Sequence, residues 1–311
     1  MYSQELQYSV VVPLYNEELV IHETYKRLKS VMDSTGESYE IIFVNDGSRD
    51  KTLEIARSLC REDKSIKLLG FSRNFGHQVA ITAGMDYAGG KAVIVIDADL
   101  QDPPEVILKM IEKWKEGYEV VYGRRIKRMG ETFLKKATAA VFYRVLKSMT
   151  SVDIPVDTGD FRLIDRKVCD ALKSIPERNR YVRGLISWLG FKQTGVEFVR
   201  EERFAGETKY PLKKMVKFAA DAITSFSYKP LKIATYAGTV LSLSSFAYLL
   251  FLLEKLFTRR PVAGWAPAVT LCLLCNGLLF ILLGIIGEYV GRIYDEAKGR
   301  PLYIIDEKEG F

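Results

Sequence analysis

The stretch that decides the fold of this chain is Val93-Ile94-Val95-Ile96-Asp97-Ala98-Asp99-Leu100-Gln101-Asp102-Pro103-Pro104. Its β-branched apolar residues predict a buried strand, and the proline pair ends the strand and can open a helix. Asp97 and Asp99 stand on alternate residues, so an extended chain would direct both carboxylates to the same face. At the carboxyl edge of a parallel sheet, such oxygen ligands suit Mg²⁺ or Mn²⁺, which keep positions open for substrate phosphates. A bare Asp-x-Asp is also typical of an ordinary polar turn, so the surrounding sequence must decide.

Three more strands, each followed by a helix, are predicted before this stretch. The strands are expected at 8–13, 40–44 and 66–70. The helix after the first strand is expected to end near Gly36, the second helix to cover 51–60, and the third to end at Tyr87. This alternation predicts an α/β fold with a parallel, helix-flanked sheet, whose polar turns gather in one crevice. Neither G-x-G-x-x-G after the first strand nor G-x-x-x-x-G-K-[ST] occurs. Phosphates would therefore be held by a metal and basic side chains rather than by a glycine-rich loop.

Size and charge indicate a domain attached to a membrane. The 311 residues can form one sizeable domain and an appendage. The net charge is +6, and much of the positive charge lies between Arg200 and Lys232 and after Arg292, on either side of apolar segments. That pattern suits a membrane surface, and no zinc finger, RNA-binding aromatic pair or continuous basic helix indicates nucleic acid. The 4 cysteines are too scattered for a disulfide framework, and residues 1–10 do not resemble a signal peptide, so the domain is expected in the cytoplasm.

Two apolar segments near the C-terminus are long enough to cross a membrane. Residues 231–253 carry only Lys232 at their edge, and residues 261–287 carry no charge, whereas about 20 apolar residues suffice to cross. The link at 254–260 is short and predicts a hairpin. Basic residues are more numerous outside the hairpin than in the link, so the large N-terminal domain and both termini are expected on the cytoplasmic side of the cell membrane. Residues 209–230 could form an amphipathic helix on the membrane surface or an ordinary domain helix.

Five motifs, taken together, resemble glycosyltransferase family 2 with its GT-A fold. They are Pro13-Leu14-Tyr15-Asn16-Glu17-Glu18, Val44-Asn45-Asp46-Gly47-Ser48-Arg49-Asp50, Asp97-Ala98-Asp99-Leu100-Gln101-Asp102-Pro103-Pro104, Thr158-Gly159-Asp160-Phe161-Arg162-Leu163 and Gly206-Glu207-Thr208-Lys209-Tyr210. The last two, with the tail at 286–303, are similar to the polyprenyl-phosphate glycosyltransferases. Within these, the chain most resembles the bacterial bactoprenol glucosyltransferases with two transmembrane helices, and more distantly dolichol-phosphate mannose synthase.

The resemblance implies an enzyme that transfers a hexose, with glucose expected, from a nucleotide-sugar such as UDP-glucose to polyprenyl phosphate. The transfer would be inverting, metal-dependent with Mg²⁺ or Mn²⁺, and located at the cytoplasmic membrane face. The chain would divide into a GT-A domain at 1–208, the juxtamembrane segment at 209–230, two transmembrane helices at 231–292 and a cytoplasmic tail at 293–311. The family also implies a homo-oligomer, expected to be a tetramer.

The resemblance further implies roles for residues in the first three motifs. Pro13, Tyr15 and Glu17 would border the nucleotide. Asp46, with Val44 beside it, would accept hydrogen bonds from the base, because a carboxylate can only accept. Asp97 and Ala98 would face the nucleotide-sugar, and Asp99 would hold the metal together with Gln101 and Asp97.

Further implied roles concern phosphate and the acceptor. Arg125, or Arg124 if the register slips by one, would contact phosphate, and Arg203 and Lys209 would hold the diphosphate or the acceptor phosphate. Asp160 matches the residue proposed as catalytic base, with Asp157 as a second candidate. A phosphate monoester has a second pKa near 6 and is mostly dianionic at neutral pH, so its oxygen hardly needs a base. Asp160 could instead orient the acceptor or complete the metal and sugar environment.

Two other functions remain open from the sequence. A processive polysaccharide synthase of the same superfamily would show a Q-x-x-R-W motif and more spans, and residues 181–188 lack that spacing. A non-catalytic, membrane-anchored sensor of nucleotide-sugars would not need the intact acidic set. His22 and His77 receive no assignment.

Overall fold

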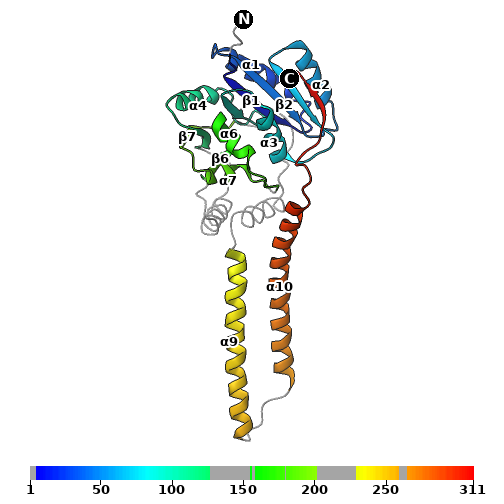
Figure 1. Cartoon of the computed structure of the whole chain (residues 1–311), viewed down its shortest axis with the longest axis vertical. Coiled ribbons are helices and arrows are strands. Elements are labelled where there is room, and N and C mark those ends of the chain that lie inside the picture. The colour runs from blue at the N-terminus through cyan, green and yellow to red at the C-terminus, as the bar shows by residue number, and fades with distance from the viewer. Residues whose placement is uncertain (1–4, 127–154, 156–157, 179, 202–228, 259–264) are drawn as a thin grey trace.

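The computed structural model describes residues 5–126, 155, 158–178, 180–201, 229–258 and 265–311 (Figure 1). Its elements are, in chain order, β1 (Tyr8–Leu14), α1 (Ile21–Asp33), β2 (Tyr39–Asn45), α2 (Thr52–Glu62), β3 (Ile66–Phe71), α3 (His77–Tyr87), β4 (Ala92–Val95), α4 (Val106–Lys115), β5 (Val120–Arg125), β6 (Thr158–Asp165), α6 (Arg166–Lys173), α7 (Val182–Trp188), β7 (Gln193–Phe198), α9 (Lys229–Phe257), α10 (Trp265–Ala297) and β8 (Ile305–Glu309).

The strands form one mixed sheet of eight strands in the order β7-β5-β6-β4-β1-β2-β3-β8. The four strands predicted from the sequence, β1 to β4, are confirmed and pair in parallel. The sheet is mostly parallel, as expected for a GT-A fold, and its exceptions are β6, which runs antiparallel to β4 and β5, and β8, which runs antiparallel to β3. Neither antiparallel strand is predicted from the sequence.

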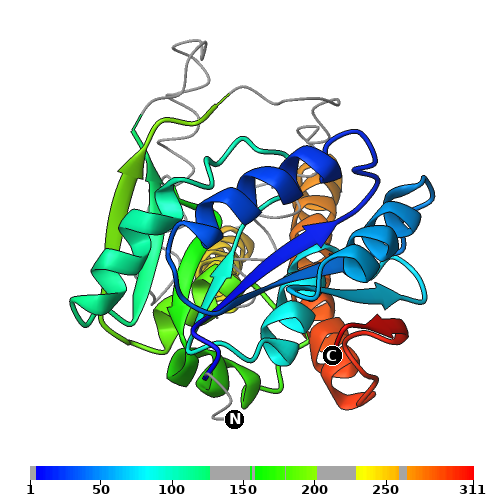
Figure 2. The ribbon, with the colours of Figure 1, turned by 90° about the horizontal axis from the view of Figure 1, so that it is seen from above.

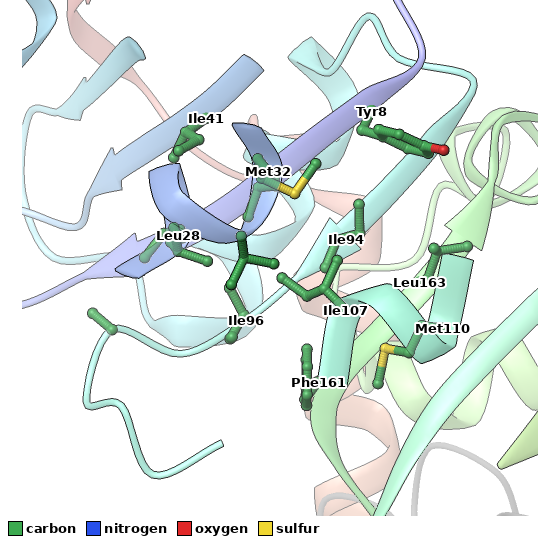
Figure 3. Close-up of a cluster of buried hydrophobic side chains, with 14 of the residues drawn as sticks. Tyr8, Leu28, Met32, Ile41, Ile94, Ile96, Ile107, Met110, Phe161 and Leu163 are labelled. Atoms are coloured by element: carbon green, nitrogen blue, oxygen red, sulfur yellow. The ribbon is translucent and has the colours of Figure 1, made fainter. Parts of the chain in front are cut away.

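Helices cover both faces of the sheet because its strand residues alternate between two cores. In β1, Val10 and Val12 belong to the core under α1, α2 and α4, while Val11 belongs to the core under α3, α6 and α7. Figure 3 shows side chains of the first core converging from α1, α4 and the strands. Strands buried on both faces read as continuous apolar runs, which is why β1, β2 and β4 are recognisable from the sequence.

Gly84 lets α3 lie directly on β1. A Cβ added at this position would stand 2.1 Å from Val11 Cγ1, so a larger residue must push the helix from the strand. We expect Gly84→Ala to lower the free energy of unfolding by about 1–3 kcal/mol through overpacking. Denaturant unfolding measures the change. Val11→Ala in the same chain should recover part of the loss, and a purely additive double variant would contradict this packing explanation.

Two long helices, α9 and α10, leave the domain on the side opposite to the N-terminus and run side by side (Figure 1), and Figure 2 shows them nearly end-on. Many of their large apolar side chains are exposed, among them Phe246, Leu274, Phe280 and Ile281. Within the part of the chain that the structure describes, one stretch, Leu274–Ala297 of α10, is long and apolar enough to cross a membrane. By length and composition alone this is weak support for a membrane span, and α9 contributes no such stretch among its described residues.

The residues after α10 return to the domain. The helix continues beyond the predicted end of the span at 292, to Ala297, and β8 then adds itself to the edge strand β3. Arg57 of α2 makes a 2.6 Å ion pair with Glu307, and the Tyr303 hydroxyl donates to Asp86 at 2.9 Å. The expected tail at 293–311 therefore includes a strand of the domain's own sheet, and it links α10 to α2 and α3.

Candidate active site

Polar residues gather at the carboxyl edge of the sheet, as the sequence predicts. The turns after β1, β2, β3 and β4 lie there because these strands are parallel. The antiparallel β6 brings its first residues, including Asp160, to the same edge, and β5 and β7 bring Arg125 and Arg200. The predicted crevice thus receives residues from both halves of the domain.

Hydrogen bonds join the turns after β1 and β2. The Asn16 amide donates to Ser48 Oγ at 3.0 Å, Asn16 Oδ1 accepts from the Arg49 amide at 2.8 Å, and the Glu17 amide donates to Thr52 Oγ1 at 2.8 Å. Asn16 adopts a positive φ of 54°, a conformation that asparagine tolerates better than most residues. These bonds place the two predicted nucleotide motifs side by side.

Three more predicted nucleotide residues lie on these two strands or directly after them. Pro13 and Val44 are register partners in β1 and β2, and both are buried. Tyr15 is 36% exposed at the edge of the sheet, where a ring can meet a ligand. This arrangement is compatible with the implied nucleotide site.

Asp46 holds the turn that follows β3. Its Oδ1 accepts from the Phe75 amide at 2.6 Å, and its Oδ2 accepts from the Gly76 amide at 3.0 Å. Burial raises the pKa of Asp46, and the two amides oppose that rise. The carboxylate is 3% exposed, so any contact with a base would be made through lone pairs that these amides do not use. Contact between Asp46 and a base stays a prediction.

Asp97 and Asp99 follow β4 at the centre of this edge. Asp99 Oδ1 accepts from the Gln101 amide at 3.1 Å, across a turn in which Leu100 adopts a φ of 56°. The intervening carbonyl, that of Ala98, accepts from Thr24 Oγ1 of α1 at 2.7 Å. The turn is thus held from α1 and from its own backbone, which fixes where the two carboxylates stand.

The Asp97 carboxylate lacks the partners that a buried oxygen normally has. Its Oδ1 is buried without a hydrogen bond from the described residues, although His77 Nε2 lies 3.4 Å away in ion-pair range. Burial, reinforced by the carboxylates of Asp160, Asp99 and Asp102 and opposed by His77, raises the pKa of Asp97 to about 6. A buried, unsatisfied oxygen is costly unless a ligand completes it.

The carboxylates fit a divalent metal that is shared with a substrate. No group of three His, Cys, Asp or Glu side chains stands ready as a complete ligand set among the described residues. Mg²⁺ is commonly held by one or two carboxylates together with substrate phosphates and water, rather than by an all-protein cage. Asp99, Asp97 with its unsatisfied oxygen, and Gln101 beside them supply hard oxygen donors of this kind.

Asp102 is a third carboxylate of this turn, and it pairs with two arginines. It is 1% exposed and lies 3.2 Å from Arg125 Nη2 and 3.6 Å from Arg200 Nε. Burial lowers the pKa of Arg200, and the nearby charge of Arg125 lowers it further. With one carboxylate between two guanidinium groups, this cluster carries a net positive charge close to the acidic pair. The sequence points to Arg125 as a phosphate contact, while Asp102 and Arg200 receive no role from it.

Asp160 stands at the start of β6 among donors from α3 and α7. Arg183 Nε donates to Oδ1 at 2.9 Å, Gln78 Nε2 donates to Oδ2 at 3.0 Å, and His77 Nε2 lies 3.3 Å from Oδ2. Although burial opposes ionisation, Arg183 and His77 hold the pKa of Asp160 well below its usual range. Burial likewise opposes protonation of His77, but Asp97 and Asp160 outweigh it and raise the pKa of His77 to about 9.

His77, Gln78 and Arg183 are site residues that the sequence does not assign. The turn at 72–78 follows a predicted strand, and this was the only available signal for His77 and Gln78. Arg183 stands in a helix without a recognisable motif. Of the predicted residues, Asp157, Arg203, Lys209 and the segment 209–228 lie outside the described residues, so their roles stay predictions.

The chain is similar to known glycosyltransferases over nearly its whole length. Residues 9–173 match the profile of "Glycosyl transferase family 2". The chain is 64% identical to an uncharacterized glycosyltransferase of Bacillus subtilis, over 99% of this chain and 96% of that protein. It is 49% identical to an uncharacterized glycosyltransferase of Synechocystis, over 98% of this chain and 96% of that protein. It is also 41% identical to a protein named bactoprenol glucosyl transferase from Shigella phage SfV, over 98% of this chain and 99% of that protein.

Proposed function

This chain belongs to glycosyl transferase family 2, and we propose that it transfers glucose from UDP-glucose to polyprenyl phosphate at a membrane surface. The observation that carries the proposal is the pairing of two unlike charge groups at one edge of the sheet. Asp97 and Asp99 supply oxygen ligands for a metal, and Arg125 and Arg200 stand around Asp102 next to them. A complex of a metal ion with a diphosphate is bound by groups of both charges. The metal ion is coordinated by carboxylates, and the phosphate oxygens accept hydrogen bonds from guanidinium groups.

The donor would lie along the turns after β1 and β2. Tyr15 and Glu17 would border the nucleotide, Asp46 would meet the base, and Arg125 would contact phosphate. When bound at Asp99, Asp97 and Gln101, Mg²⁺ or Mn²⁺ would neutralise charge on the departing diphosphate. The acceptor would attack the anomeric carbon from the side opposite to the departing diphosphate, which inverts the configuration of that carbon.

The acceptor would be a phosphate monoester, whose oxygen attacks the anomeric carbon while the bond to the nucleoside diphosphate breaks. That oxygen is already ionised at neutral pH, so no strong base has to stand beside it. Arg203 and Lys209 are proposed to hold the diphosphate or this acceptor phosphate, and Asp157 is the second candidate, after Asp160, for the acidic catalytic residue.

We propose further that α9 and α10 cross the membrane as a hairpin with the domain and both chain ends on the cytoplasmic side, and that residues 209–230 lie along its surface. Support comes from the exposed apolar side chains of both helices and from the basic residues that flank them. A homo-oligomer, with a tetramer expected, belongs to the same proposal. A lipid acceptor would reach the domain from this surface.

A direct assay tests the proposal. Purified full-length protein in lipid nanodiscs is given labelled UDP-glucose and undecaprenyl phosphate, with Mg²⁺, Mn²⁺ or a chelator. We expect labelled lipid that disappears with the chelator. A panel of other UDP- and GDP-sugars identifies the donor, and the absence of labelled lipid with every donor would contradict glycosyl transfer to polyprenyl phosphate.

A further inference from the structure

The carboxylate of Asp160 has little capacity left for a substrate. Besides the three donors of Arg183, Gln78 and His77, Arg183 Nη2 lies 3.5 Å from Oδ2. A carboxylate offers about four lone-pair positions, two on each oxygen. The contacts from Gln78, His77 and Arg183 Nη2 all fall on Oδ2, and Oδ1 accepts from Arg183 Nε, so both oxygens are held by the protein. A general base needs a lone pair directed at the proton it removes.

Two of these donors are themselves fixed by backbone contacts. Gln78 Oε1 accepts from the Val182 amide at 3.1 Å, so the orientation of its side-chain amide is set by both ends. Arg183 Nη1 donates to the Thr158 carbonyl at 2.8 Å, while its Nε holds Asp160. Side chains of α3 and α7 thus form hydrogen bonds with the first residues of β6.

We propose that Gln78 and Arg183 are positioning residues that act through Asp160, and that Asp160 is a fixed anchor for His77 rather than a proton acceptor. His77 Nε2 lies between Asp160 Oδ2 and Asp97 Oδ1, at 3.3 and 3.4 Å. Asp160 therefore sets where the imidazole stands beside the carboxylate that faces the donor. The inference rests on the proposed glycosyl transfer and deepens it.

Two variants test the anchor. Gln78→Glu keeps the acceptor for the Val182 amide but replaces the donor to Asp160 by a like charge, and Arg183→Gln removes the guanidinium. Because misplacement by about 1 Å can cost about 10²-fold in rate, we expect each variant to lower kcat by about 10–100-fold. KM for UDP-glucose should change little, since the proposed nucleotide contacts lie on other turns. Arg61→Gln is the matched control, because its side chain is 70% exposed and lies on α2. An unchanged kcat in both variants would overturn the proposal.

The pH profile separates an anchor from a base. The charged groups that face Asp160 are His77, Arg162, Arg183 and Asp97. If Asp160 were the base, loss of Arg183 would raise its pKa, move the acidic limb of kcat to higher pH, and restore activity at high pH. For an anchor, we expect Arg183→Gln to reduce kcat across the profile and to leave the acidic limb where the acceptor phosphate sets it. A shifted limb with recovered activity would overturn the proposal.

A spectroscopic readout keeps the inference separate from the reaction. The chain has 2 histidines, so protein labelled only at histidine gives one ring signal set for His77 and one for His22. We expect Arg183→Gln and Gln78→Glu to shift the His77 signals and to leave those of His22 unchanged. Unchanged His77 signals would overturn the anchor whatever the enzyme transfers. Failure of the wild-type protein to form labelled lipid, with the His77 shifts still observed, would contradict the proposed function alone.

Discussion

Asp99→Ala is expected to lower the rate of sugar transfer by about 10³-fold or more while the domain stays folded. The carboxylate is proposed to hold a divalent metal, and such a metal stabilises transition-state charge by several kcal/mol. Because about 1.4 kcal/mol corresponds to a tenfold change in rate, its loss should slow the reaction by several powers of ten. Asp99 Oδ1 accepts a hydrogen bond from the Gln101 amide, and loss of that bond costs about 1 kcal/mol of stability. Activity is measured as labelled lipid, and folding as thermal unfolding of the same preparation.

The control for this prediction is Asp170→Ala on α6. Asp170 has a side chain that is 65% exposed and lies 3.9 Å from Arg166, in a weak surface pair. Its removal should leave both activity and unfolding temperature nearly unchanged. Calorimetric titration with Mn²⁺ in the presence of UDP gives an independent measure, since Asp99→Ala should weaken metal binding and Asp170→Ala should not. Wild-type activity in Asp99→Ala would remove Asp99 from the metal site.

Gly47→Ala is expected to destabilise the domain by about 3 kcal/mol or more and to disrupt the turn that Asp46 holds. Gly47 has a φ of 63°, and an added Cβ would stand 2.5 Å from the backbone of Arg73 and Asn74. Backbone cannot move aside as the end of a side chain can. The turn at 73–76 would have to shift, which would break the hydrogen bonds that the Phe75 and Gly76 amides donate to Asp46. Thermal unfolding and KM for UDP-glucose should both show the change.

Gly36→Ala measures the conformational part of that effect alone, so the difference between the two variants gives the steric part. Gly36 has a similar φ of 66°, but nothing lies within 4 Å of the added Cβ. It should therefore bear only the conformational cost of a left-handed residue, about 1–2 kcal/mol. Equal losses of stability in the two variants would show that the contact between Gly47 and the turn at 73–76 is unimportant.

Local pattern was sufficient for much of the fold. The runs at 8–13, 40–44, 66–70 and 93–96 are apolar because both faces of their strands are covered, and this signal is contained in a few consecutive residues. The strand β8 could not be predicted from the sequence because its residues are mostly charged. Its sequence, Ile-Asp-Glu-Lys-Glu, lies at an edge, where it is held by Arg57 and by β3 rather than by its own hydrophobicity.

The sequence by itself determined that this chain is a family 2 glycosyltransferase with an acidic turn after its fourth strand, because strand, turn and carboxylates are consecutive there. Only the tertiary structure decided which charged groups meet around that turn. Gln78 and Asp160 are 82 residues apart, and Asp102 and Arg125 are 23 apart. Such pairs depend on how the sheet orders its strands, above all on β6 running against its neighbours, and no local spacing encodes that order. The structure thus surrounds Asp160 with donors, which argues against a role as base and favours one as an anchor.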